Sequence, residues 1–145
     1  MKKIIAIVLF SFLLLSVYSC NKSSNNPVTP TKPNLTGHWI GSGNYTYTNI
    51  IPITATVNLD LTITGTDDAT GTVDQVLTGS GTMKITAIGQ TITDQSIPIL
   101  AGTFKNPDVN ITTLVYTGKL STDQKSIVGN MTYQTYTVPI TLNKQ

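Results

Sequence analysis

The segment from Ile53 to Thr64 has the most regular pattern in the sequence, a strict alternation of apolar and polar residues. Its apolar members are Ile53, Ala55, Val57, Leu59, Leu61 and Ile63. The residues between them are threonine, asparagine or aspartate. An α-helix repeats every ~3.6 residues and cannot produce this pattern, whereas a β-strand turns alternate side chains to opposite faces. The segment therefore predicts a strand with one face in a core and the other in water.

The rest of residues 35–145 is predicted to form further strands of the same kind. The predicted strands are 37–47, 53–64, 72–77, 81–88, 91–103, 109–120, 127–133 and 136–142. The chain contains 26 threonines, and β-branched side chains of this type suit a pleated surface. Pro98 and Pro139 each lack a backbone donor, so we expect them at edges, bulges or strand ends.

These strands predict an all-β domain with antiparallel strands joined mostly by short loops. Because consecutive strands tend to pair, an up-and-down barrel of roughly eight strands is the simplest topology. The interior of such a barrel holds only side chains or one small ligand. A Greek-key β-sandwich is the alternative, because strand spacing alone does not separate the two folds.

Residues 1–19 carry the pattern of a secretory signal peptide. Lys2 and Lys3 precede an apolar run from Ile4 to Val17. As a helix this run would rise about 21 Å, which is short of the roughly 30 Å hydrocarbon layer of a membrane. We therefore expect this segment to be removed rather than to stay as a permanent span.

Cys20, the only cysteine of the chain, stands directly after this segment. The residues before it resemble the lipobox of bacterial lipoprotein precursors, with Val17 and Tyr18 in place of the usual leucine and small residue. Lipoproteins of this kind, including those of the Bacteroidota, carry acyl chains such as palmitate on that cysteine. The resemblance implies that Cys20 is the lipid attachment site. The alternative is an ordinary signal peptide that is cut elsewhere and leaves Cys20 as a free thiol.

The segment from Cys20 to Asn34 is predicted to be a tether. It contains prolines at 27, 30 and 33, and Val28 is its only aliphatic residue. Such a composition cannot bury enough surface to offset its ordering entropy, and regularly spaced prolines favour polyproline II. The fourteen residues from Asn21 to Asn34 would reach roughly 40 Å in that conformation. We expect a barrel held on a stalk at the outer membrane of a Gram-negative bacterium, facing either the periplasm or the cell surface.

The charged residues argue against several classes of function. The chain has no arginine and no glutamate, and removal of Lys2 and Lys3 leaves seven lysines against seven aspartates. Without arginine or a basic cluster, we expect no binding to nucleic acid. The chain has one histidine, His38, and one cysteine, which are too few to form a zinc site or a catalytic site built on a histidine and its orienting group. We therefore predict no enzyme, no cofactor and no metal. A hydrolase that uses aspartates is the remaining catalytic alternative.

The residues Leu35-Thr36-Gly37-His38-Trp39 open the first predicted strand with a Gly-x-Trp motif. This start resembles that of lipocalins and other calycins, in which the tryptophan closes one end of the barrel. Thr122-Asp123 is similar to the Thr-Asp element of a lipocalin loop. The late arginine that packs on the tryptophan in lipocalins has no counterpart, because the chain contains no arginine. The resemblance implies a lipocalin-like barrel and carries over no ligand.

The aromatic residues are the candidate binding residues. Trp39, Tyr45 and Tyr47 share the predicted inner face of the first strand, and Tyr116 and Tyr133 can join them from later strands. Ring faces with hydroxyl tips suit a small amphipathic ligand. We predict a non-enzymatic, lipid-anchored envelope protein that binds such a ligand or a protein partner in the envelope. The alternative is a purely structural or partner-docking domain, in which these rings only fill the barrel.

Overall fold

The computed structural model describes residues 32–48 and 50–145, and residues 33–145 form one compact unit. The predicted signal peptide, the proposed lipid attachment site Cys20 and most of the predicted tether lie outside the described residues. Within the described part of the chain, no helix has the length and hydropathy needed to cross a membrane.

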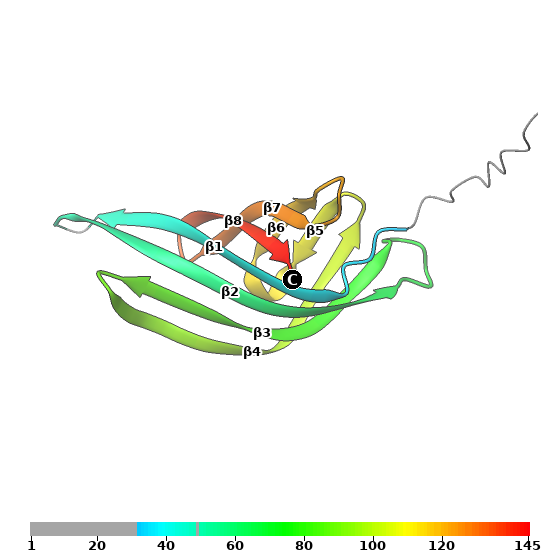
Figure 1. The fold of residues 1–145 in the computed structure, drawn as a ribbon, viewed down its shortest axis with the longest axis horizontal. Coiled ribbons are helices and arrows are strands. Elements are labelled where there is room, and N and C mark those ends of the chain that lie inside the picture. Colours follow the sequence, from blue (N-terminus) through cyan, green and yellow to red (C-terminus); the bar gives the residue numbers. More distant parts are fainter. Residues whose placement is uncertain (1–31, 49) are drawn as a thin grey trace, which may run out of the picture. The chain divides into compact units, whose positions relative to one another are not determined.

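Eight antiparallel strands close into one barrel, in the order in which they follow in the sequence (Figure 1). The strands are β1 (Gly37–Thr48), β2 (Pro52–Asp67), β3 (Gln75–Ala87), β4 (Gln90–Lys105), β5 (Asp108–Ile111), β6 (Tyr116–Leu120), β7 (Ser126–Tyr133) and β8 (Tyr136–Lys144). The barrel closes where β8 pairs with β1 over Trp39 to Ser42. The predicted all-β up-and-down barrel is confirmed, and the sandwich alternative is wrong.

One predicted break between strands is absent. The predicted strands 72–77 and 81–88 are parts of the single strand β3, which begins at Gln75. Gly79 and Gly81 lie within this strand, and each faces the backbone of β2 so closely that a Cβ atom would collide with a carbonyl oxygen there. These glycines therefore allow two strands to approach each other rather than mark a turn.

A second prediction missed a break. The predicted strand 109–120 is divided into β5 and β6 by the short 3-10 helix η1 (Thr112–Leu114) and by Val115, which has φ +49°. The buried apolar residues change phase here, because Ile111 occupies an odd position whereas Leu114 and Tyr116 occupy even ones. No glycine or proline marks the break in the sequence, so high strand propensity concealed it.

Pro98 and Pro139 lie where no ladder donor is needed, as predicted. Pro98 lies in β4 at a register shift against β3. Pro139 lies in β8 beyond the end of the β8–β1 ladder, which stops at Thr141.

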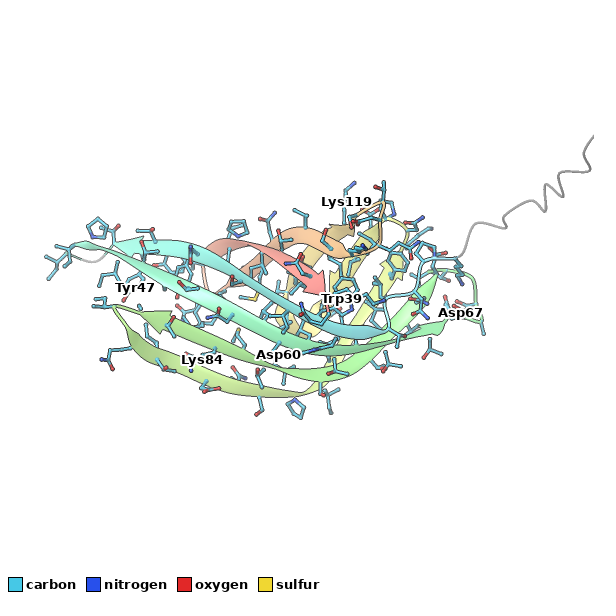
Figure 2. The ribbon with its side chains drawn as sticks, viewed as in Figure 1. Trp39, Tyr47, Asp60, Asp67, Lys84 and Lys119 are labelled. Carbon is cyan, nitrogen blue, oxygen red and sulfur yellow. The ribbon has the colours of Figure 1, made fainter. Side chains whose placement is uncertain are left out.

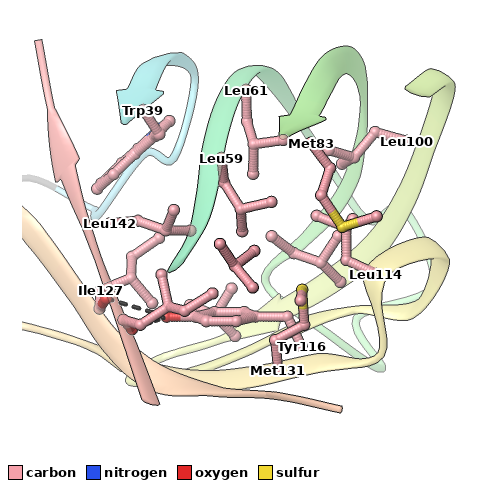
Figure 3. Close-up of a cluster of buried hydrophobic side chains, with 14 of the residues drawn as sticks. Trp39, Leu59, Leu61, Met83, Leu100, Leu114, Tyr116, Ile127, Met131 and Leu142 are labelled. Carbon is pink, nitrogen blue, oxygen red and sulfur yellow. Dashed lines mark hydrogen bonds between the residues drawn. The ribbon is translucent and has the colours of Figure 1, made fainter. Parts of the chain in front are cut away.

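The apolar face of β2 points into the barrel, as the sequence predicts. Val57, Leu59 and Leu61 are buried, and apolar side chains from the other strands surround them (Figure 3). Among the described residues, the buried core lies between Leu35 and Leu142.

Tyr116 fills the middle of the barrel and is fully buried. Its single hydroxyl proton is shared between two acceptors, the carbonyl oxygens of Ile127 at 3.0 Å and Ile140 at 3.2 Å. Its ring lies against two paired glycines, Gly118 and Gly129, and a Cβ atom at Gly129 would lie 2.8 Å from the ring carbon Cζ. The glycines thus make room for the ring, and the interior at this level is packed rather than hollow.

The segment before β1 closes one end of the barrel. Leu35 is fully buried, and its backbone N–H donates to the side-chain oxygen of Gln75 at 3.1 Å. The indole N–H of Trp39 donates to the carbonyl oxygen of Leu35 at 2.8 Å. The predicted role of Trp39 in closing one end of the barrel agrees with this arrangement.

Candidate functional site

The two ends of the barrel differ in their turns. The turns 49–51, 88–89 and 134–135 join β1–β2, β3–β4 and β7–β8 at one end, which we call the tyrosine end. The loops 68–74 and 121–125 lie at the opposite end, which we call the charged end, and the chain leads into β1 there. Tyr47 and Asp67 mark the two ends in Figure 2.

Four half-buried tyrosines come together at the tyrosine end. Tyr45 and Tyr47 alternate along the inner face of β1, Tyr133 ends β7 and Tyr136 begins β8. The ring centroid of Tyr45 lies 4.9 Å from that of Tyr136, 6.0 Å from that of Tyr133 and 6.3 Å from that of Tyr47. The rings are tilted by 31° to 47° against one another, and all three centroid distances fall within the range of about 4.5–7 Å at which aromatic pairs attract.

These rings line a pocket of about 190 Å³. Its other lining residues are Ile92 from β4 and Gln134 from the β7–β8 turn. The side chain of Ile92 is 55% exposed, so an apolar surface faces the pocket without being covered. The pocket therefore combines ring faces, an aliphatic side chain, phenol hydroxyls and one amide.

None of the residues that line this pocket is charged, and the nearest charges along β3 and β4, Lys84 and Asp94, pair with each other in the ladder. Residues 43–59, 85–93 and 126–143 contain no lysine, aspartate or histidine. The pKa of Tyr45 is raised by burial and by the neighbouring tyrosines, so its hydroxyl stays protonated at neutral pH. The site consequently offers hydrogen bonds but no charge for a ligand to pair with.

No known protein family, no curated protein and no solved structure matches this chain. The site is therefore interpreted from its own geometry.

The structure brings together three of the five predicted binding residues, Tyr45, Tyr47 and Tyr133. Trp39 and Tyr116 are fully buried and lie elsewhere in the core. Burial also raises the pKa of Tyr116, whose hydroxyl is already occupied by two carbonyl oxygens. Both residues support the barrel rather than line the pocket.

Sequence reasoning missed Tyr136. The sequence predicted a tight turn at Gln134-Thr135, and the residues that flank a two-residue turn are cross-strand partners. Tyr133 does pair with Tyr136 in the β7–β8 ladder. The predicted turn was thus the signal that could have placed Tyr136 beside Tyr133 among the candidate binding residues.

The titratable groups elsewhere serve the fold or the surface. Nε2 of His38 lies 2.7 Å from Oδ1 of Asp60 on the exposed outer face of β1 and β2. Asp68 accepts hydrogen bonds from Thr70 and from the backbone N–H groups of Thr72 and Val73, and these bonds lower its pKa to about 2. Among the described residues, no group of three or more His, Cys, Asp or Glu residues is placed to hold a metal ion.

Proposed function

We propose that the protein is a non-enzymatic binding module whose tyrosine pocket takes a small, uncharged amphipathic ligand. The observation that carries this proposal is the meeting of four tyrosines and the exposed Ile92 around one pocket at an end without charge. Aromatic rings with hydroxyl tips can cover an apolar ligand surface and still bond to its polar groups.

The size of the pocket limits the ligand. Pockets for drug-sized molecules span roughly 300–1,000 Å³, so a pocket of about 190 Å³ holds only one or two rings or a short apolar chain. The packed interior around Tyr116 gives the ligand no deeper place. We infer a ligand that lies at the mouth of the barrel with one part in solvent.

We also propose that the protein is attached to a Gram-negative outer membrane through acyl chains on Cys20. The support is the lipobox-like sequence and the lack of a second cysteine to pair with Cys20. Two or more acyl chains are enough for stable anchoring. Residues 33–36 lead into β1 at the charged end, opposite the tyrosine pocket.

A partner-docking domain is the second candidate, because much of the interior is filled. The residues predicted to separate the two alternatives, Tyr45 and Tyr47, lie around a pocket, whereas Tyr116 fills the core. This arrangement favours binding at the mouth over a role for the rings as filling alone. No carboxylate lines the pocket, so it offers nothing to the hydrolase alternative.

The test uses N-phenyl-1-naphthylamine, an uncharged amphipathic dye that fluoresces in apolar sites. Residues 21–145, which contain the complete barrel and its core, should bind it with saturable fluorescence. Tyr45→Ala and Tyr136→Ala should each weaken binding about tenfold, which corresponds to ~1.4 kcal/mol. Val128→Ser, which removes an exposed apolar side chain from β7 outside the pocket, is the control. Equal binding by the tyrosine variants and the control would refute the proposal.

A further inference from the structure

Three isoleucines project from the tips of two neighbouring hairpins at the tyrosine end. Ile50 is 91% exposed, Ile51 64% and Ile88 75%, and we call these three residues the isoleucine rim. Ala55 pairs with Ala87 in the β2–β3 ladder, which places the β1–β2 and β3–β4 tips at the same end of the barrel (Figure 1). Exposed apolar side chains are ordinary when scattered singly, but a group of them at the tips of turns requires an explanation.

Ile88 combines a positive φ with an exposed β-branched side chain, as Val115 does at the joint between β5 and β6. Ile88 has φ +51° and Gly89 has φ +71°, so both central residues of this two-residue turn are in the left-handed region. Turns of this kind favour Asn-Gly, and a β-branched residue with positive φ is strained. The side chain is also exposed, so little packing compensates for the strain. At the tip of a hairpin, an exposed apolar side chain of this kind is available for a contact outside the barrel.

The surroundings of the rim define what it can contact. The segments that form these tips, 43–59 and 85–93, contain no charged residue, and the nearest charges of the β3–β4 hairpin, Lys84 and Asp94, pair with each other in the ladder. The tyrosines of the pocket stand behind the tips, within the same end of the barrel. Apolar tips with tyrosines behind them match the interface of a bilayer, where aliphatic groups enter the acyl region and tyrosines lie at the level of the headgroups.

The shape of the rim distinguishes a bilayer from a protein partner. A stable protein interface needs about 800 Å² of complementary surface on each partner. The rim instead consists of a few side chains on projecting turns, which a fluid lipid surface can surround. We propose that the isoleucine rim inserts into the interface of a bilayer of zwitterionic phospholipid, which carries no net charge. The tyrosine pocket, at the same end, would then open toward the lipid.

The experiment measures binding of residues 21–145 to sedimented vesicles of phosphatidylcholine. The wild-type domain should bind, and binding should be unchanged between low and high salt because no charge contributes. The double variant Ile50→Ser/Ile51→Ser and the single variant Ile88→Asn should each reduce the partition coefficient about tenfold or more. Ile88→Asn should also melt at the same temperature as wild type or higher, because asparagine tolerates positive φ.

Ile99→Ser is the matched control, because Ile99 is also 75% exposed but lies in the middle of β4 away from the tips. It should bind vesicles like wild type. Four results would each overturn the proposal: no binding of wild type to phosphatidylcholine, binding only to phosphatidylglycerol vesicles at low salt, rim variants that bind like Ile99→Ser, or a rim that mediates dimers in place of lipid binding.

Discussion

The side-chain ammonium of Lys144 lies 5.4 Å from the ring centroid of Trp39 and also donates to the carbonyl oxygen of Asn34 at 3.1 Å. The last strand is thereby joined to the tryptophan of the first strand and to the segment before it. The chain contains no arginine that could pack on Trp39. In this chain a lysine from β8 contacts the ring.

We predict that Lys144→Ala lowers the free energy of unfolding by about 1 kcal/mol, because a partly desolvated cation over an indole contributes on that scale. Lys144→Arg should keep most of the stability, since the guanidinium can occupy the same place. Urea denaturation followed by tryptophan fluorescence measures both. Lys84→Ala, on the exposed face of β3, is the control, and an equal loss in Lys84→Ala would contradict this role of Lys144.

The β2–β3 loop predicts a loss of stability in acid. The hydrogen bonds from Thr70, Val73 and Thr72 lower the pKa of Asp68 from 3.8 to about 2 in the folded state. A carboxyl group with a lowered pKa stabilises the fold fully above its unfolded pKa, and this contribution disappears as the pH falls from about 4 through 2. Asp68→Asn should therefore reduce the loss of stability across this range, while Asp123 still contributes because its pKa is also lowered.

Direct titration of the Asp68 carboxyl by NMR tests the cause. Thr70→Val removes the hydroxyl donor and should move the pKa of Asp68 part of the way back toward 3.8. A pKa that does not change in this variant would mean that the loop does not hold the carboxylate in this way.

Lipid attachment is tested in the cell. Cys20→Ala, or treatment with globomycin, should leave an uncleaved precursor without acyl chains. Metabolic labelling with palmitate and a shift in gel mobility measure the result. Cys20→Ala protein that is processed and labelled like wild type would remove the anchor from the proposal.

The sequence predicted features whose signal lies within one strand and missed those that depend on contacts between strands. The alternation of apolar and polar residues in β2 predicted its inner face, because successive side chains of a strand point to opposite faces and only one face of β2 is apolar. The joint at η1 was missed because Thr112 and Thr113 favour strands, and the only trace of the break is a change of phase between Ile111 and Leu114. That signal becomes visible only when both flanking segments are known to face one core.

The site was predictable only in part for a related reason. Tyr45 and Tyr47 belong to one strand, so their shared face followed from their spacing. Their meeting with Tyr136 depends on closure of β8 onto β1, a pairing between opposite ends of the domain that no local pattern reports. The isoleucine rim is likewise invisible before the turns are known, because strand propensity makes Ile88 look like part of a strand.

The central claim is that a ligand occupies the tyrosine pocket and not the barrel interior. Residues 21–145 contain five tyrosines, four around the pocket and Tyr116 in the core. NMR spectra with labelled tyrosine rings, recorded during titration with N-phenyl-1-naphthylamine, separate the two places. We predict that the signals of Tyr45, Tyr47, Tyr133 and Tyr136 shift with a common saturation curve while that of Tyr116 stays fixed. A shift confined to Tyr116, or equal shifts of all five, would contradict the account.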